Sequence, residues 1–182
     1  MKRSRRTLAI AISIFLLLPT FLLGQENEKK DIWEPFRFFV GSWEGTGQGQ
    51  SGVSKIETEF KFVLSDNYLQ VTNKAVFEPQ EKNPEGEVHE DLGLISYDSS
   101  REKFVLRQFH VEGFVNQYVL DSLSSDGKVL VFVTESIENI PPGWRARLTY
   151  TVENEDELSS IFELAAPEKD FWICSENHLK RK

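Results

Sequence analysis

From Phe38 to the C-terminus, the sequence consists mainly of short segments in which apolar and polar residues alternate. Successive side chains of a β-strand point to opposite faces, so this alternation predicts strands with one buried and one solvated face. About ten such segments follow one another. A sheet with many strands must protect its edges, and closure into a barrel removes them. The sequence therefore predicts an all-β fold, a closed antiparallel up-and-down barrel of about ten strands.

The segment 56–64 shows the alternation most clearly, because Ile56, Phe60 and Leu64 fall on one face while charged residues fall on the other. Turn-forming pairs such as Asp126-Gly127 separate the segments. A short helical turn within 31–40 is expected to cap one barrel end. Two longer, proline-containing loops, 78–87 and 137–143, are expected to rim a cavity mouth. The expected strands cover residues 41–50, 56–64, 68–77, 88–97, 103–111, 114–121, 128–136, 144–152, 157–165 and 171–179.

The first 24 residues have the pattern of an export signal. A basic start, Lys2 to Arg6, precedes an uncharged and mostly aliphatic run from Thr7 to Leu23, and a cut near Gly24 places a small residue at the cleaved bond. The alternative is an uncleaved N-terminal membrane anchor. We expect export to the periplasm or the medium, without stable membrane insertion after cleavage. The expected organisation is a signal peptide (1–24), an N-terminal segment with the helical cap (25–37) and a barrel domain (38–182).

The charge balance excludes one class of partner. Cleavage removes four of the 21 basic residues and none of the 29 acidic ones, which leaves a net charge of −12. Such a surface repels phosphate backbones, so we expect no nucleic-acid partner. The single cysteine, Cys174, forms no internal disulfide. No Gly-x-Ser-x-Gly or His-x-His motif is present, so binding is a better expectation than catalysis.

A two-residue turn at Glu112-Gly113 predicts the register of one hairpin. In that register Arg107, Asn116 and Tyr118 point into the barrel. A buried guanidinium needs an acceptor, either an internal carboxylate such as that of Glu135 or the oxygen-rich head group of a ligand. If residues 111–113 instead form a three-residue loop, the register shifts by one residue and Arg107 points to water.

Two further strands contribute candidate residues. Trp144 and Tyr150 share the apolar face of the expected strand 144–152, so both are predicted to line the interior. Glu87, His89 and Asp91 share one face of the strand 88–97, which offers His89 as an alternative metal ligand. An isolated histidine is more often structural, and we expect no metal site.

The first expected strand carries a resemblance to a known family. Residues 39–49, with Gly41-Ser42-Trp43 followed by Gly45 and Gly47, resemble the opening of the ten-stranded barrels of the calycin group, specifically the nitrobindin-like and fatty-acid-binding-protein-like barrels. Residues 88–91, 107–114 and 141–147 are similar to a bacterial branch of unassigned function. The lipocalin-like Gly-x-Trp element implies that Trp43 closes one end and packs on Lys180 or Arg181. Gly45 and Gly47 are expected to allow close backbone approach as the barrel closes.

The resemblance also implies candidate ligands. Nitrobindins hold haem through a histidine near the start of the final strand and act on nitric oxide and peroxynitrite. The corresponding stretch here, 166–170, contains no histidine, and His178 is the histidine of the final strand. Fatty-acid-binding proteins bind a carboxylate through an arginine and a tyrosine, a role that corresponds to Arg107 and Tyr118.

We therefore expect an exported barrel that binds a small apolar or amphipathic molecule, such as a fatty acid. One alternative is a haem-binding protein with nitrobindin-like chemistry, and haem is the one cofactor considered. Another is an interaction protein that forms a homodimer through an outer barrel face on which Leu130 or Phe132 is exposed.

Overall fold

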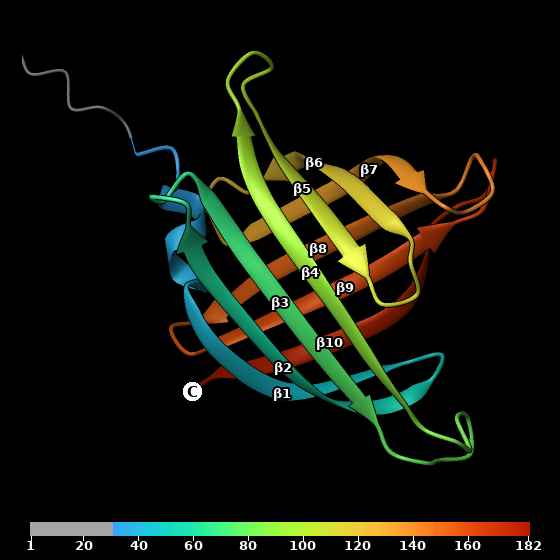
Figure 1. Cartoon of the computed structure of the whole chain (residues 1–182). Helices are drawn as coiled ribbons and strands as arrows, with labels where there is room; N and C mark the ends of the chain where they lie inside the picture. The colour runs from blue at the N-terminus through green and yellow to red at the C-terminus, as the bar shows by residue number, and fades with distance from the viewer. Residues whose placement is uncertain (1–30) are drawn as a thin grey trace, which may run out of the picture. The chain divides into compact units, whose positions relative to one another are not determined.

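A computed structural model describes residues 31–182, which contain ten antiparallel strands closed into a barrel (Figure 1). Each strand pairs with its neighbours in sequence, and β1 pairs with β10 to close the barrel. This confirms the predicted fold class. The strands are β1 (Gly41–Gly49), β2 (Gly52–Val63), β3 (Tyr68–Phe77), β4 (Glu87–Asp98), β5 (Lys103–His110), β6 (Val115–Leu123), β7 (Val129–Glu138), β8 (Arg145–Asn154), β9 (Glu157–Ala165) and β10 (Trp172–Arg181).

The alternation in sequence becomes an alternation in burial. In β2, every second residue from Gly52 to Phe60 is buried, and the residues between them are exposed. The strand bounds agree with the expected ones to within about four residues, because the polar turns end each strand where the pattern stops. The expected signal peptide, residues 1–24, lies outside the described residues. None of the described helices has the length and apolar character needed to cross a membrane.

A short 3-10 helix closes one end of the barrel, as predicted. This helix, η1 (Glu34–Phe39), has a proline in its first turn, where the missing N–H costs nothing. Phe36 and Phe39 are each 1% exposed and pack against strand aromatics. We call this cluster the aromatic plug and the half of the barrel around it the capped half. The plug comprises Trp33, Phe36, Phe39, Phe60 and Phe104.

Trp43 joins the capped half to the closing seam of the barrel. Its side chain is fully buried, and its indole Nε1 donates to the carbonyl of Phe39 at 2.7 Å. The guanidinium of Arg181 lies 4.2 Å from the Trp43 ring centroid and donates to the carbonyls of Val40 and Phe38. The predicted contact between Trp43 and a basic residue of the last strand is thus confirmed for Arg181. It ties the C-terminal strand to the chain that leaves η1.

Glycines permit the close approach of β1 and β10 at this seam. A Cβ atom on Gly45 would lie 1.9 Å from the carbonyl oxygen of His178. A Cβ atom on Gly47 would meet the Asn177 side chain at 2.3 Å. Gly45 therefore allows the predicted close approach of two backbones, whereas Gly47 leaves room for neighbouring side chains.

The expected register of the β5–β6 hairpin is wrong by one residue. Arg107 pairs with Gln117 rather than with Tyr118, and Gln108 pairs with Asn116. The reason is a longer turn: the Gly113 N–H donates to the His110 carbonyl, and the His110 N–H donates to the carbonyl of Phe114. A shift of one residue exchanges the two faces of a strand. Leu106, Gln108 and His110 consequently replace Val105, Arg107 and Phe109 on the inner face.

Candidate functional site

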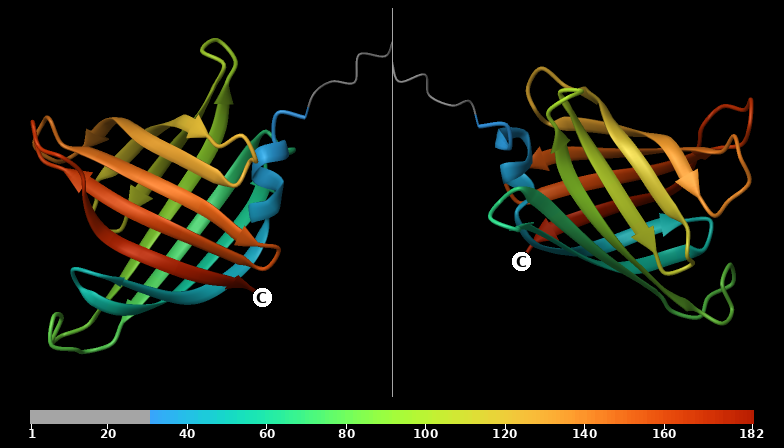
Figure 2. Two further views of the ribbon diagram at one scale, coloured as in Figure 1. Left: turned by 180° about the vertical axis from the view of Figure 1, so that it is seen from behind. Right: turned by 45° about the horizontal axis from the view of Figure 1, so that its top comes forward.

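A cavity of about 360 Å³ occupies the half of the barrel away from η1. We call this the cavity half; the loops that connect β1 to β2 and β3 to β4 lie at this end (Figure 2). Its volume falls within the usual range of about 300–1,000 Å³ for small-molecule sites. Its apolar wall comprises Ile56, Ala75, Phe77, Phe114, Leu148, Tyr150, Phe162, Leu164 and Leu179. Its polar and ionisable lining includes Ser54, Thr58, Asn73, Glu87, His89, Asp91, Gln108, His110, Glu112, Ser160, Ser175 and Asn177.

The mouth is formed by turns rather than by the loop expected at 137–143. Gln50 and Ser51 of the β1–β2 turn line the cavity, as do Glu112 and Phe114 of the β5–β6 turn. The predicted rim at 78–87 contributes its last residue, Glu87. The loop at 137–143 contributes no lining residue to this cavity.

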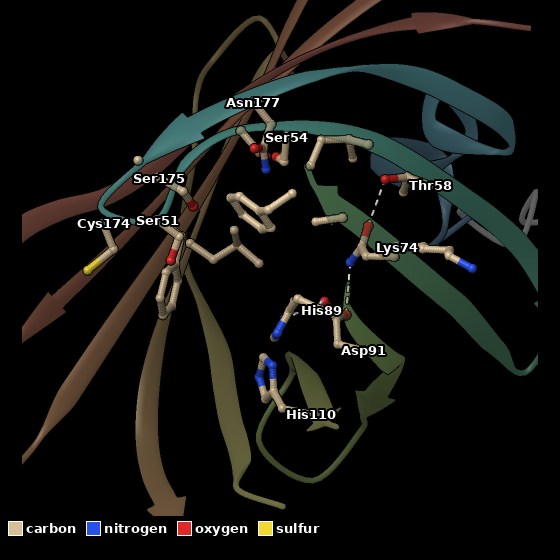
Figure 3. Close-up of a pocket in the computed structure, with 18 of the residues that line it drawn as sticks. Ser51, Ser54, Thr58, Lys74, His89, Asp91, His110, Cys174, Ser175 and Asn177 are labelled. Atoms are coloured by element: carbon tan, nitrogen blue, oxygen red, sulfur yellow. Dashed lines mark hydrogen bonds and ion pairs between the residues drawn. The ribbon is translucent and has the colours of Figure 1, made fainter. Parts of the chain in front are cut away.

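Four side chains form a hydrogen-bonded row across the inner faces of β2, β3, β4 and β5, which we call the polar row. Figure 3 shows the part of the row that runs from Thr58 to Asp91. The Thr58 hydroxyl donates to Asn73 Oδ1 at 2.7 Å, and Asn73 Nδ2 donates to Asp91 Oδ1 at 2.9 Å. Gln108 Nε2 donates to the same Asp91 oxygen at 2.9 Å. The Asp91 side chain is only 6% exposed. Two amide donors therefore compensate a carboxylate that the barrel has removed from water.

His89 lies between two carboxylates at the cavity. Its Nδ1 is 2.6 Å from Glu112 Oε1, and its Nε2 is 3.7 Å from Asp91 Oδ2. The pKa of His89 is raised to about 9, chiefly through Asp91 and also through Glu112, while burial acts in the opposite direction. The 3.7 Å separation is too long for a direct hydrogen bond, so we attribute the effect of Asp91 to the attraction of a nearly buried charge. His89 is thus an imidazolium at neutral pH.

His110 faces the same cavity and differs from His89 in protonation. Burial lowers the pKa of His110 to about 4, so this imidazole is neutral at pH 7. Its ring stacks on Phe114 with centroids 4.1 Å apart, and its Nε2 is 3.2 Å from Asn116 Nδ2. Among the described residues, His110 Nδ1 and Asn116 Oδ1 are buried atoms without a hydrogen-bond partner. Two imidazoles in different protonation states therefore meet at the cavity, with ring centroids 5.6 Å apart.

The structure separates the predicted ligand-binding residues. Arg107 is exposed on the outer face of β5, where one guanidinium nitrogen is 3.4 Å from Ser96 Oγ, so its predicted interior position is wrong. Glu135, the expected internal acceptor, pairs with Arg101. The one-residue shift of the hairpin accounts for this difference. The arrangement of Arg107 and Tyr118 expected for a carboxylate clamp is not formed.

The other candidates differ in their position relative to the cavity. Tyr150 lines the cavity from β8 and is 7% exposed; burial raises its pKa above the usual value. Asn116 and Tyr118 point inward as predicted, but both are buried and neither lines the cavity. Asn116 Nδ2 donates to the Tyr118 hydroxyl at 2.9 Å. Burial likewise raises the pKa of Tyr118. Trp144 precedes β8 and packs edge-to-face on Trp172, outside the cavity lining.

His178 does not fit the haem-ligand role that the family resemblance implies. Its side chain is exposed, and the inner positions of β10 on either side belong to Asn177 and Leu179. The histidines that face the cavity are His89 and His110, on β4 and β5. An iron held by His178 would lie outside the barrel, so no haem chemistry follows from that residue.

Sequence reasoning missed Asn73, Gln108 and His110 as site residues. The register of a two-residue turn points Arg107 inward and so, by alternation, places Gln108 and His110 on the outer face. The alternative three-residue loop at 111–113 shifts the register by one residue and places both side chains inside the barrel. Leu130 and Phe132, expected to be exposed at a dimer interface, are instead fully buried core residues. The exposed apolar residues of the outer face include Leu92 and Phe109, which pair on β4 and β5.

Comparisons with known proteins support the fold alone. No protein-family model matches the chain, and no curated protein matches it. Among solved structures, the chain is similar to a crystal structure of Rv2717c from M. tuberculosis, with 21% identity over 82% of this chain and 96% of that one and a TM-score of 0.64. It also matches a de novo designed fluorescence-activating β-barrel, with 13% identity over 80% of this chain and 94% of that one and a TM-score of 0.41.

Proposed function

We propose that this protein is a binding protein that holds a small amphipathic molecule in the cavity half of its barrel. The observation that supports the proposal is the 360 Å³ cavity, whose lining combines apolar side chains with the polar row. A ligand with an apolar body gains about 25 cal/mol per Å² of apolar surface removed from water. Hydrogen-bonding side chains such as Gln108 and Asn177 then fix the orientation of its polar end.

The charges at the cavity favour a neutral or cationic head group. Glu87, Asp91 and Glu112 line it, against the single imidazolium of His89. Lys74 extends away from the cavity and forms an ion pair with Glu90, so it does not offset these charges (Figure 3). A carboxylate would meet like charges here, since Arg107 lies outside. The proposed ligand is therefore an alcohol, amide or amine with a medium-length apolar chain rather than a fatty acid.

Calorimetric titration with octan-1-ol, octylamine and octanoate tests this proposal, because the three compounds have the same chain length and differ only in their head group. We expect saturable one-to-one binding of the alcohol and the amine to the EDTA-treated protein, and binding of octanoate at least about tenfold weaker, since tenfold corresponds to about 1.4 kcal/mol. Equal affinity for octanoate would refute the head-group assignment. Absence of saturable heat with all three compounds would refute the binding function.

Two variants connect the binding to the cavity. Ala75 lines the cavity on β3, so Ala75→Phe places a ring where the ligand would lie and should abolish binding. Arg107→Leu should leave all three affinities unchanged, because Arg107 is on the outer face. Loss of binding in Arg107→Leu, or retention in Ala75→Phe, would place the binding site elsewhere.

We also propose that the barrel acts outside the cytoplasm, after cleavage near Gly24. The support is the basic start and uncharged run of residues 1–23. N-terminal sequencing of the protein isolated from its native host should yield a chain that starts close to Gln25. A chain that starts at Met1 would contradict export by cleavage.

A further inference from the structure

His89, His110 and Glu112 form a cluster whose chemistry goes beyond hydrogen bonding to an organic ligand. One ring nitrogen of each imidazole and one carboxylate oxygen of Glu112 lie within 4.8 Å of one another. The three residues come from β4, from the end of β5 and from the turn that follows it. Pairing of Asp91 with His110 brings the two strands together, and the Val111 N–H bond to the Glu90 carbonyl extends that pairing to the turn.

We propose that His89, His110 and Glu112 bind one divalent transition-metal ion of the zinc class. Two imidazoles and one carboxylate form a donor set that zinc accepts with a further coordination position left open, and binding would release the proton of the His89 imidazolium to solvent. With metal–ligand distances of about 2.0–2.2 Å, tetrahedral donors lie roughly 3.4 Å apart. His89 Nδ1 and Glu112 Oε1, which are 2.6 Å apart, must therefore separate, while a pair at the 4.8 Å limit must approach by about 1.4 Å. The Glu112 side chain is 49% exposed and lies in a turn, so it is free to make that movement.

The surroundings of the cluster hold its ligands in place. Asp91 lies 3.7 Å behind His89 Nε2 and is itself fixed by Asn73 and Gln108. The amide of Asn116 contacts His110 Nε2, which leaves Nδ1 as the ring atom without a protein partner. Because an amide N–H can only donate, this contact makes Nε2 the acceptor and leaves the proton of the neutral ring on Nδ1. Metal binding through Nδ1 therefore requires the Asn116 amide to rotate, so that Oδ1, itself without a partner, accepts from Nε2–H. Stacking on Phe114 further restricts the His110 ring.

An ion pair alone explains only part of this arrangement. Attraction between an imidazolium of His89 and the two carboxylates accounts for the 2.6 Å contact with Glu112. It does not account for a second, oriented imidazole whose Nδ1 is buried without a partner. A metal ion gives that nitrogen a partner and uses all three side chains. The cavity contacts each of them, so the open coordination position would face the proposed ligand site.

The test uses the metal alone, so its outcome is independent of the organic ligand. The full chain, without a polyhistidine tag, is treated with EDTA, dialysed and titrated with ZnCl2 by calorimetry, and metal content is measured after a second dialysis. We expect one zinc ion per chain. His110→Gln and Glu112→Gln should each weaken binding at least about tenfold. His178→Gln provides the matched control, since it removes an exposed histidine from the outer face and should change nothing.

Cobalt supplies a spectroscopic readout at the same site. Co²⁺ added to the EDTA-treated protein should give the visible absorption of a four- or five-coordinate ion, and His110→Gln should remove it while the far-UV circular dichroism of the barrel is retained. Substoichiometric zinc uptake by the parent protein would overturn the proposal. So would unchanged affinity in both His110→Gln and Glu112→Gln, or an equal loss in His178→Gln.

Discussion

The two halves of the barrel use the same alternating strands for different purposes. In the capped half, the inner positions carry aromatic rings. Trp43 and Arg181 donate hydrogen bonds to the backbone carbonyls at the C-terminal end of η1. In the cavity half, the inner positions carry amides, hydroxyls, carboxylates and imidazoles beside apolar side chains, all around open space. Polar side chains inside a barrel cost stability unless they are compensated. We infer that the capped half supplies the stability that allows the other half to hold a site.

Trp43→Ala should have the largest effect on stability. Removing a fully buried tryptophan deletes its transfer free energy and leaves a cavity, with a typical cost of about 3–5 kcal/mol. The matched change is Trp144→Ala at the other end of the barrel, where the indole is only half-buried. Urea unfolding should show a smaller loss for Trp144→Ala. An equal loss in the two variants would remove the distinction between the halves.

Arg181→Gln should follow, with a loss of about 2–3 kcal/mol. The variant breaks two hydrogen bonds to the carbonyls of Val40 and Phe38 and the contact with the Trp43 ring. Lys180→Gln is the control, because the neighbouring Lys180 side chain is 76% exposed. Its free energy of unfolding should stay within about 0.5 kcal/mol of the parent value. Equal values for the two variants would show that the seam adds no stability.

Replacing an interior alanine with phenylalanine at two positions compares the packed core with the open cavity directly. Ala146 is fully buried in the core, so Ala146→Phe should cost about 1–3 kcal/mol through overpacking. Ala75→Phe extends into the cavity and should cost less, while it abolishes ligand binding. Thermal unfolding and octan-1-ol titration of both variants measure the two effects. A larger stability loss in Ala75→Phe would mean that the cavity is effectively packed.

The two cavity histidines predict opposite pH dependences of stability, each on the order of 1–2 kcal/mol. The raised pKa of His89 gives stability that is complete below pH 6.5 and is lost as pH rises through about 9. The lowered pKa of His110 gives stability that is present above pH 6.5 and is lost as pH falls toward 4.

Urea unfolding of the metal-free protein between pH 4 and 9 checks these signs. The alkaline decline should flatten in His89→Gln, and the acid decline should flatten in His110→Gln. His178→Gln should keep both declines. Identical profiles for the parent and both cavity variants would contradict the assignment of charge to the two imidazoles.

The sequence predicted the capped half better than the cavity half, for a physical reason. Alternation, the Trp43 element and the proline-containing turn are local patterns, and each produced the expected strand, seam or cap. The site depends on the faces of β5 and β6, and those follow from the length of one turn at 111–114. A one-residue error in the length of that turn places Arg107 on the inner face of β5, where the structure has Gln108 and His110. The meeting of His89 with His110 also required strand register, which alternation alone does not specify.

The most direct test of the account is mass spectrometry of an organic extract of the protein isolated from its native host, with the Ala75→Phe variant prepared in parallel. Binding in the cavity predicts a stoichiometric small molecule with an apolar chain and a neutral or basic head group in the parent protein, and its absence from the variant. An extract without such a molecule, or the same molecule in both preparations, would contradict binding in the barrel cavity.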